Sequence, residues 1–380
     1  MFVNPLTPHA TRGNNVYVSD DWKRRMERAA VELLHRDDPV ALVREVDALD
    51  ASSRYPYVWP RGPVFGVAAL GPQPGACWRL VSEATDGTPQ EARDALNSLL
   101  WFQAKDEAGT VAERRELLVA VRLLECDRID ELTVLGTRYR VVRGDEYARC
   151  GLTEGPEPPR PTDPEPADRS WRHQPGRAQT LPDIGHPLDA LIDDPTVSVG
   201  VMAEGNRQAL RDFTYEGEHV PPAIRAESRQ AVHDHPELVL LPVGFGVVKR
   251  TGTGWTPVGR LQPTPHDARR VLHNGLAGTW ADMYDLDAAS CDAYARAAER
   301  LEFAPHVNEV TVQGDTYRIC RVERMLRTGP DGPEPPRRSD PETTEPMRIR
   351  PLLDEHGVIQ PEPDGMNTGG DDRPDDGGPH

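Results

Sequence analysis

Two short stretches carry the side chains best suited to chemistry. Residues 131–143 read ELTVLGTRYRVVR and residues 309–321 read EVTVQGDTYRICR, with seven of thirteen positions identical. The polar residues of interest that they share are Tyr139, Arg140 and Arg143 in the first and Tyr317, Arg318 and Arg321 in the second. A guanidinium group grips carboxylates and phosphates with two parallel hydrogen bonds. These six residues are therefore candidates for binding a protein partner or a small anionic ligand.

A second interpretation of the same arginines is structural. On a strand, Arg140 faces one way, whereas Tyr139 and Arg143 face the other. Arginines on an edge strand deter association between sheets and pair with acids. The chain has only three lysines among its 44 cationic residues, so arginine is its default cation. This composition favours the structural interpretation.

A proline-rich motif also occurs twice. Gly155-Pro156-Glu157-Pro158-Pro159-Arg160 returns letter for letter at residues 332–337. Such a rigid segment could dock into an aromatic-lined groove of a partner. Both copies continue to an Asp-Pro pair, and a strap lying across its own domain explains a repeated, low-entropy segment equally well. We favour the strap.

His233 and His235 form the only His-x-His pattern and flank Asp234. On a strand, residues i and i+2 share a face and could hold a metal ion together with a carboxylate. The first repeat has Ser53 and Tyr55 at these places, which favours ordinary surface histidines at a helix end. The sequence contains no nucleophile elbow, zinc-protease motif or phosphate-binding loop, so we predict neither catalytic residues nor a cofactor.

The elements around these residues repeat as well. Apolar runs ending at Phe65-Gly66-Val67 and Phe245-Gly246-Val247 are predicted strands. Each is followed by a turn, a second strand and a Thr-Pro helix start at Thr88 or Thr264, where threonine caps and proline occupies the first turn. Second helices are predicted at 111–125 and 288–303, before the hairpins that hold the tyrosines and arginines. The repeat units span residues 55–165 and 235–342.

Further elements are predicted around the units. An amphipathic helix is expected at 20–35, followed by one from Pro39 to Leu49 that buries Val40, Val43, Val46 and Leu49. Between the units we predict a strand at 196–202 and helices at 206–213 and 223–233. The full division is a flexible arm at 1–18, a first domain at 19–154, a Pro-rich linker at 155–188, a second domain at 189–342 and a disordered acidic tail at 343–380.

Composition limits the possible partners. The 380 residues carry a net charge of −18, which argues against a nucleic-acid binder and against an anionic membrane surface. The N-terminus shows no apolar signal region, and five widely spaced cysteines fit a reducing compartment, so we expect a cytoplasmic protein.

The hairpin and strap stretches together, ELTVLGTRYRVVR with GPEPPRPTDP and EVTVQGDTYRICR with GPDGPEPPRRSDP, resemble an uncharacterised actinobacterial family of unknown function. The resemblance implies no chemistry. We predict an α+β protein with two tandem copies of a β-β-α-α-β-β domain in a pseudo-twofold arrangement, with N-terminal helices. Its predicted function is non-catalytic binding or adaptor activity at the junction of the repeats. The alternatives are a metal-assisted hydrolase near His233 and His235, and an oligomeric scaffold.

Overall fold

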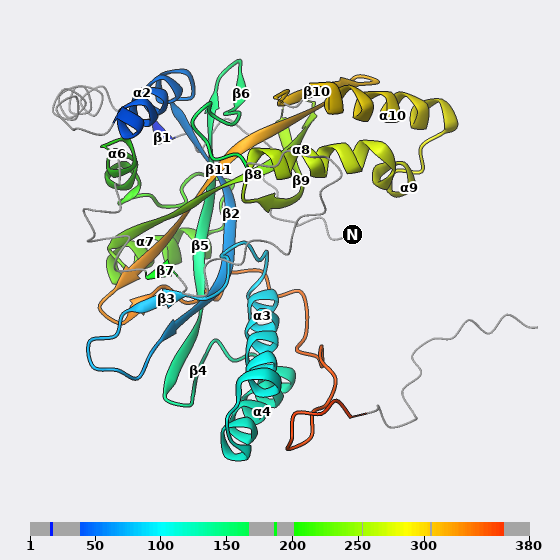
Figure 1. Ribbon diagram of the computed structural model, residues 1–380. Helices are drawn as coiled ribbons and strands as arrows, with labels where there is room; N and C mark the ends of the chain where they lie inside the picture. Colours follow the sequence, from blue (N-terminus) through cyan, green and yellow to red (C-terminus); the bar gives the residue numbers. More distant parts are fainter. Residues whose placement is uncertain are drawn as a thin grey trace, which may run out of the picture.

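The computed structural model describes residues 16–17, 39–166, 186–187, 201–252, 254–304 and 306–360. It has a mixed α/β fold built on one antiparallel sheet, whose main strands lie in the order β7-β3-β2-β5-β11-β8-β9. No helix in these ranges is long and apolar enough to span a membrane. In Figure 1, α3 and α4 extend toward the bottom, while α8, α9 and α10 extend toward the upper right.

The elements of the first half are β1 (Val16–Tyr17), α2 (Pro39–Arg54), β2 (Tyr57–Leu70), β3 (Trp78–Leu80), α3 (Pro89–Phe102), the π-helical turn η1 (Gln103–Glu107), α4 (Val111–Cys126), β4 (Glu131–Val134), β5 (Thr137–Gly151) and β6 (Gly155–Pro156). Those of the second half are β7 (His186–Pro187), α6 (Val201–Leu210), α7 (Pro222–Asp234), β8 (Glu237–Thr251), β9 (Gly254–Gln262), α8 (Pro265–Asn274), the π-helical turn η2 (Gly275–Thr279), α9 (Trp280–Met283), α10 (Ala288–Phe303), β10 (Glu309–Val312), β11 (Asp315–Gly329) and β12 (Gly332–Pro333).

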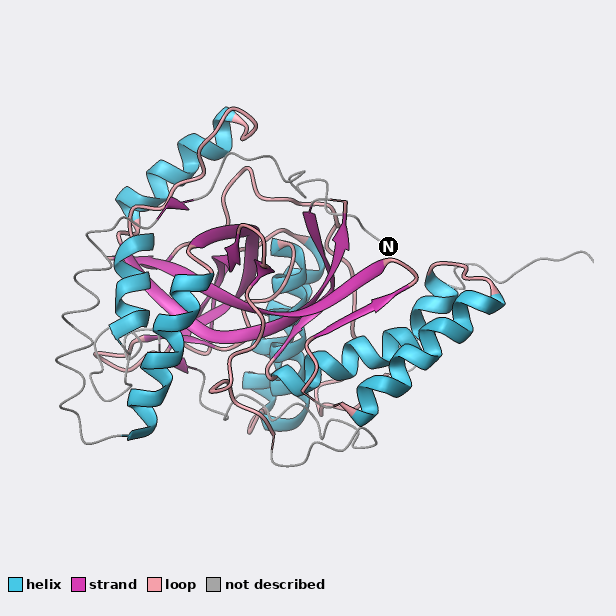
Figure 2. Cartoon of the chain, turned by 90° about the horizontal axis from the view of Figure 1, so that it is seen from above, coloured by secondary structure: helices cyan, strands magenta, loops and turns pink. Residues whose placement is uncertain are grey.

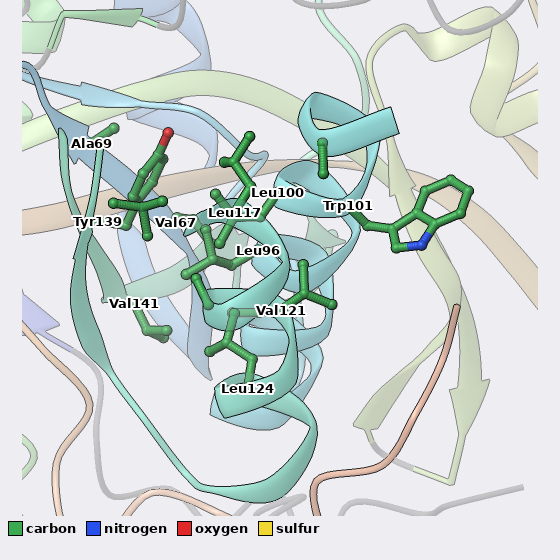
Figure 3. Packing of buried hydrophobic residues seen from close by; sticks show 14 of the residues in the cluster. Val67, Ala69, Leu96, Leu100, Trp101, Leu117, Val121, Leu124, Tyr139 and Val141 are labelled. Carbon is green, nitrogen blue, oxygen red and sulfur yellow. The ribbon is translucent and has the colours of Figure 1, made fainter. Parts of the chain in front are cut away.

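Helices lie on either side of the strands when the molecule is seen from above (Figure 2). The helix pair α3–α4 packs on β2 and β5 through a buried apolar cluster that contains Val67, Leu96, Leu117 and Val141 (Figure 3). The corresponding cluster under α8 and α10 contains Phe245, Leu272, Leu301 and Ile319. Burial of one such side chain contributes about 1.5–3 kcal/mol, so these clusters hold the helices in place.

The predicted helix starts form as expected. Thr88 Oγ1 accepts a hydrogen bond from the Glu91 amide at 3.2 Å, and Pro89 occupies the first turn of α3. Thr264 accepts from the Asp267 amide at 3.1 Å at the start of α8. The second helices, α4 and α10, also lie within a residue of their predicted bounds.

The helix after Asp38 was predicted with the wrong face buried. Val40, Val43 and Val46 of α2 are 61%, 58% and 58% exposed. The face that packs carries Ala48, Ala51 and Ser52. Periodicity identifies an apolar stripe but not its partner surface, and here the small side chains face α6 and β5.

Two further predictions need correction. Residues 201 and 202, expected at the end of a strand, begin α6. The predicted disordered tail is wrong for residues 343–360, because these dock on α3 and α4: the Trp101 indole donates to the Pro351 carbonyl at 2.9 Å, and Leu353 packs against the core. The remaining tail, the expected helix at 20–35, and residues 188–200 lie outside the described residues.

The capping geometry predicts a local stability effect. Thr88→Ala removes the acceptor for the Glu91 amide and is expected to lower the free energy of unfolding by about 1 kcal/mol, measured by urea denaturation. Thr88→Ser keeps the hydroxyl oxygen and should stay within a few tenths of a kcal/mol of wild type. Equal losses in the two variants would show that the hydroxyl is not the cause.

Candidate functional site

The two long strands β5 and β11 lie at the centre of the sheet, yet they pair with each other over only a few residues. Gly144 to Tyr147 face Leu326 to Glu323 in antiparallel register. Beyond this segment the strands separate, and a strap enters each gap. We call residues 155–165 the first strap and residues 332–342 the second strap.

Each strap places a glutamate backbone between the separating strands. The Glu334 amide donates to the Arg327 carbonyl of β11 at 2.9 Å, and the Glu334 carbonyl accepts from the Arg143 amide of β5 at 2.8 Å. Arg143 and Arg327 would otherwise be the next direct pair. The second strap therefore replaces the ladder at this point and keeps the backbone groups of both strands hydrogen-bonded.

The first strap does the same in the other gap. The Glu157 amide donates to the Arg149 carbonyl of β5, and the Glu157 carbonyl accepts from the Arg321 amide of β11, both at 2.8 Å. Thus each strap follows one long strand in sequence, pairs back with that strand and also hydrogen-bonds to the other long strand. We call the contact of the second strap with β5 the first crossing, and that of the first strap with β11 the second crossing.

Arg140 and Arg318 occupy matching places at the two crossings. Arg140 Nη1 donates to the carbonyls of Asp331 and Pro333 at 2.9 and 3.1 Å. Arg318 Nη1 donates to the carbonyls of Glu154 and Pro156. Their guanidinium groups lie 5.0 Å above the Trp78 ring and 4.8 Å above the Trp255 ring. Such cation–π contacts add to the hydrogen bonds that hold the incoming strap.

Arg143 and Arg321 hold the straps from the opposite face of the sheet. Arg143 is 2% exposed and contacts Asp145 at 3.0 Å and Asp340 of the second strap at 3.1 Å. Arg321 contacts Glu323 and, at 3.3 Å, Asp163 of the first strap. Because β5 and β11 are central strands, the predicted edge position of these arginines is wrong. The predicted pairing of these arginines with acids is present in the structure.

The buried acids and arginines change one another's pKa values. Burial alone would raise the pKa of Asp145, but the neighbouring Arg143 and Arg337, with a hydrogen bond from Tyr215, hold that pKa below its usual value. Burial likewise opposes ionisation of Glu323, yet Arg321 and Arg149 lower its pKa to about 2. Both carboxylates are therefore charged at neutral pH and contribute to the ion pairs.

The glycines of the strap motif have a steric role. Gly332 has φ +103° and Gly155 has φ +76°. A Cβ atom would lie 2.3 Å from Trp78 Nε1 at Gly332 and 2.7 Å from Trp255 Nε1 at Gly155. Only glycine lets the strap backbone press against the indole in this conformation. This explains why both copies of the motif begin with glycine.

The predicted tyrosines lie away from the strap arginines. Tyr139 is buried beneath α3 and α4. Tyr317 stacks on Trp280 with ring centroids 4.8 Å apart, and its hydroxyl lies 3.1 Å from that of Tyr294. Both tyrosines belong to the helix-packing cores, so the structure does not bring them together with Arg140 or Arg318 in one site.

His233 and His235 lie at the C-terminal end of α7 rather than on a strand. The strand on which the metal hypothesis relied is therefore absent at these residues. Among the residues that the structure describes, no group of three or more His, Cys, Asp or Glu side chains is arranged to hold a metal ion. His233 is exposed, whereas His235 faces a cavity.

This cavity, of about 340 Å³, opens beside the first crossing. Its lining consists of Asp130, Glu131, Arg140, Asp234, His235, Pro330, Asp331 and Pro335. Nδ1 of His235 is buried and has no hydrogen-bond partner. Burial lowers the pKa of this imidazole, so it is neutral at pH 7. The wall of the cavity thus contains a neutral imidazole beside several carboxylates.

Sequence reasoning identified Arg140, His235 and the neighbouring Asp234 but missed the other three acids of the cavity. Asp130 precedes β4, Glu131 begins β4, Asp234 ends α7, and Asp331 lies in the turn between β11 and β12. No spacing connects these positions, since they approach one another only when the second strap reaches β5. The repeat alignment contained one signal, because Asp130, just before the first stretch, corresponds to Asn308, just before the second.

Residues 38–343 match the model of a family of unknown function, DUF5954. The chain belongs to this family. The match extends from the start of α2 to the end of the second strap and so includes both crossings. The resemblance to an uncharacterised family is thereby confirmed. No curated protein and no solved structure matches this DUF5954 chain.

Loss of a strap arginine is expected to destabilise the DUF5954 fold. Arg143→Gln leaves Asp145 and Asp340 without their shared cation in a buried environment, which costs about 3–5 kcal/mol of unfolding free energy. Arg122→Gln on the exposed face of α4 removes the same charge and should change stability by less than about 0.5 kcal/mol. Denaturant titrations measure both, and similar values would refute the anchoring role of Arg143.

The contact between the second strap and Trp78 is testable with a matched glycine pair. Gly332→Ala and Gly314→Ala both place alanine at a positive φ, but only the first meets another residue, since no atom lies within 4 Å of a Cβ at Gly314. Gly314→Ala should cost about 1 kcal/mol of stability. Gly332→Ala should cost clearly more and alter Trp fluorescence; equal losses would exclude the steric explanation.

Proposed function

We propose that this DUF5954 protein is a non-catalytic binding protein built from two tandem copies of one β-β-α-α-β-β unit, and that it binds its ligand at the junction of the copies. The cavity beside the first crossing carries this proposal. One part of its lining comes from β4 and β5 of the first copy, and the rest comes from the end of α7, the turn between β11 and β12, and the second strap. Its volume lies at the lower end of the range for small-molecule sites.

The pairing of β5 with β11 supports the duplication. The repeated stretches align Asp145 with Glu323 and Tyr147 with Met325. In the sheet, Asp145 faces Met325 and Tyr147 faces Glu323, so exchanging the two strands reproduces the same register. This is the relation expected across a twofold axis, here near the pair Glu146 and Arg324.

The straps support a binding role for the junction rather than for either copy alone. Arg93 at the start of α3 contacts Glu342 of the second strap at 2.7 Å. Arg269 at the start of α8 contacts Glu165 of the first strap at 2.6 Å. The helices, the hairpins and the straps are thus tied together at each crossing. A ligand there meets walls that are already held in place, which lowers the entropic cost of binding.

A small-molecule screen tests the proposed function without assuming the charge of the ligand. A library of anions, cations and neutral compounds is added to the full chain, and binding is detected by ligand-observed NMR. Asp234→Tyr places a bulky ring at the exposed edge of the cavity, and Asp292→Tyr makes the same change on the exposed face of α10.

We expect compounds that bind wild type and Asp292→Tyr but lose binding in Asp234→Tyr. If no compound of any charge binds, or if every binder is retained by Asp234→Tyr, the junction cavity is not the binding site and the proposal fails.

A further inference from the structure

We propose that Cys150 and Cys320 are a disulfide pair that the first strap holds apart, so that their oxidation requires release of the strap and then prevents its return. The inference goes beyond the proposed binding function, because it concerns the second crossing and not the cavity. Both cysteines are buried free thiols, Cys150 in β5 and Cys320 in β11.

The register of the two long strands makes these cysteines opposite partners. Tyr147 faces Glu323 at the end of the direct pairing. Continuing this antiparallel register by three residues along each strand places Cys150 opposite Cys320, on the same face of the sheet. Directly opposed residues of antiparallel strands have Cα atoms about 4.5–5.5 Å apart, which lies within the range that a disulfide needs. The two cysteines would therefore meet if β5 and β11 were paired directly here.

The first strap prevents this contact. Cys150 pairs with Pro156 of the strap. The amide and the carbonyl of the neighbouring Glu157 hydrogen-bond to β5 and β11. A strand inserted between two others doubles their separation to roughly 9–10 Å. Cysteines whose Cα atoms are more than about 7 Å apart cannot be bridged without movement of the backbone. The disulfide and the inserted strap thus exclude each other.

The two thiols are protected from oxidation while the strap is in place. Burial raises the pKa of Cys150 to about 12, and the nearby Cys320 adds to this increase. Burial also raises the pKa of the Cys320 thiol. Because the thiolate is the reactive form, buried thiols of this kind are inert. Oxidation therefore has to follow opening of the second crossing.

The cysteine pair does not follow from the sequence repeat. The repeated stretches align Cys320 with Val142, and the same offset aligns Cys150 with Thr328. The first crossing therefore has no thiol at either of these places, whereas the second crossing has one at both. Two cysteines that the repeat does not account for thus lie opposite each other across one strap.

The first strap is also the less deeply anchored of the two. The side chain of Arg318 is 18% exposed and that of Arg321 is 13% exposed. Their counterparts at the first crossing, Arg140 and Arg143, are 5% and 3% exposed. Beyond the second strap, residues 343–360 add further contacts with α3 and α4. Since exposed ion pairs contribute little, the first strap is expected to open more readily than the second.

The oxidation step uses a low-molecular-weight disulfide such as oxidised glutathione. The thiolate of one cysteine attacks this disulfide, forms a mixed disulfide and releases one glutathione. The second protein thiolate attacks the protein sulfur of the mixed disulfide and releases the other glutathione. The two protein thiols lose two electrons and two protons, which the two glutathione molecules take up, so the step is balanced.

Peptide mapping of the full chain after incubation with oxidised glutathione tests the inference. The reduced protein is oxidised, and the remaining thiols are blocked with N-ethylmaleimide before digestion without reductant. Asp163→Asn weakens the Arg321 contact that holds the first strap, and Asp340→Asn makes the matched change at Arg143. Cys150→Ser is the control that cannot form the pair.

A milder matched pair gives the same comparison if either charge variant does not fold. Thr162→Ala and Ser339→Ala remove the hydroxyl groups with which the first and second straps donate to Asp47 and Glu227. Circular dichroism and thermal midpoints show which variants are folded.

We expect a Cys150–Cys320 disulfide in wild type. It should form at least about fivefold faster in Asp163→Asn and within about twofold of the wild-type rate in Asp340→Asn. In the oxidised protein the Glu157 amide should lose its protection against hydrogen exchange, whereas the Glu334 amide keeps its protection. Reduction should restore the protection of Glu157.

Three results overturn the inference. If no disulfide forms even in Asp163→Asn, the strands do not close when the strap is loosened. If Asp340→Asn accelerates the reaction as much as Asp163→Asn, oxidation follows global unfolding and not release of the first strap. If the disulfide forms while the Glu157 amide stays protected, the pair does not displace the strap.

Discussion

The insertion of a strap backbone between β5 and β11 is the interaction on which the rest of the structure depends. The two strands pair directly over a short central segment, and beyond it their buried amides and carbonyls require other partners. Glu157 and Glu334 provide them, each by donating to one strand and accepting from the other. The straps thereby extend the contact between the two halves beyond the central segment and beyond the apolar clusters that pack Val142 with Leu326 and Tyr147 with Met325.

The charged side chains follow from this arrangement. Glu157 and Glu334 are 2% and 3% exposed, and their carboxylates pair with Arg160 and Arg337 at the end of the same motif. Buried carboxylates of this kind must be paired and hydrogen-bonded, because an isolated buried charge is costly. The arginines that first suggested an anion site are likewise paired with acids inside the protein. They hold the straps against the long strands.

The two crossings have the same architecture but differ in the charge of the side chains that line them. Asp130 and Asn308 receive equivalent arginines, so a neutral amide is sufficient for the structural task. The difference gives the first crossing a carboxylate where the second has a neutral amide.

The sequence by itself determined the local structure. Threonine caps followed by proline set the starts of α3 and α8, apolar periodicity set α4 and α10, and alternation around glycine set the hairpins, because each depends on neighbours within a few residues. Only the tertiary structure decided which surfaces those elements meet. The valines of α2 are exposed, and residues 343–360 dock on the first helix pair, because burial depends on surfaces far away in the chain.

The crossing of the straps could not be predicted from the sequence for the same reason. The repeats align each proline motif with the hairpin that precedes it. The fold also places it against the long strand of the other half, where the separating strands leave backbone groups to be satisfied.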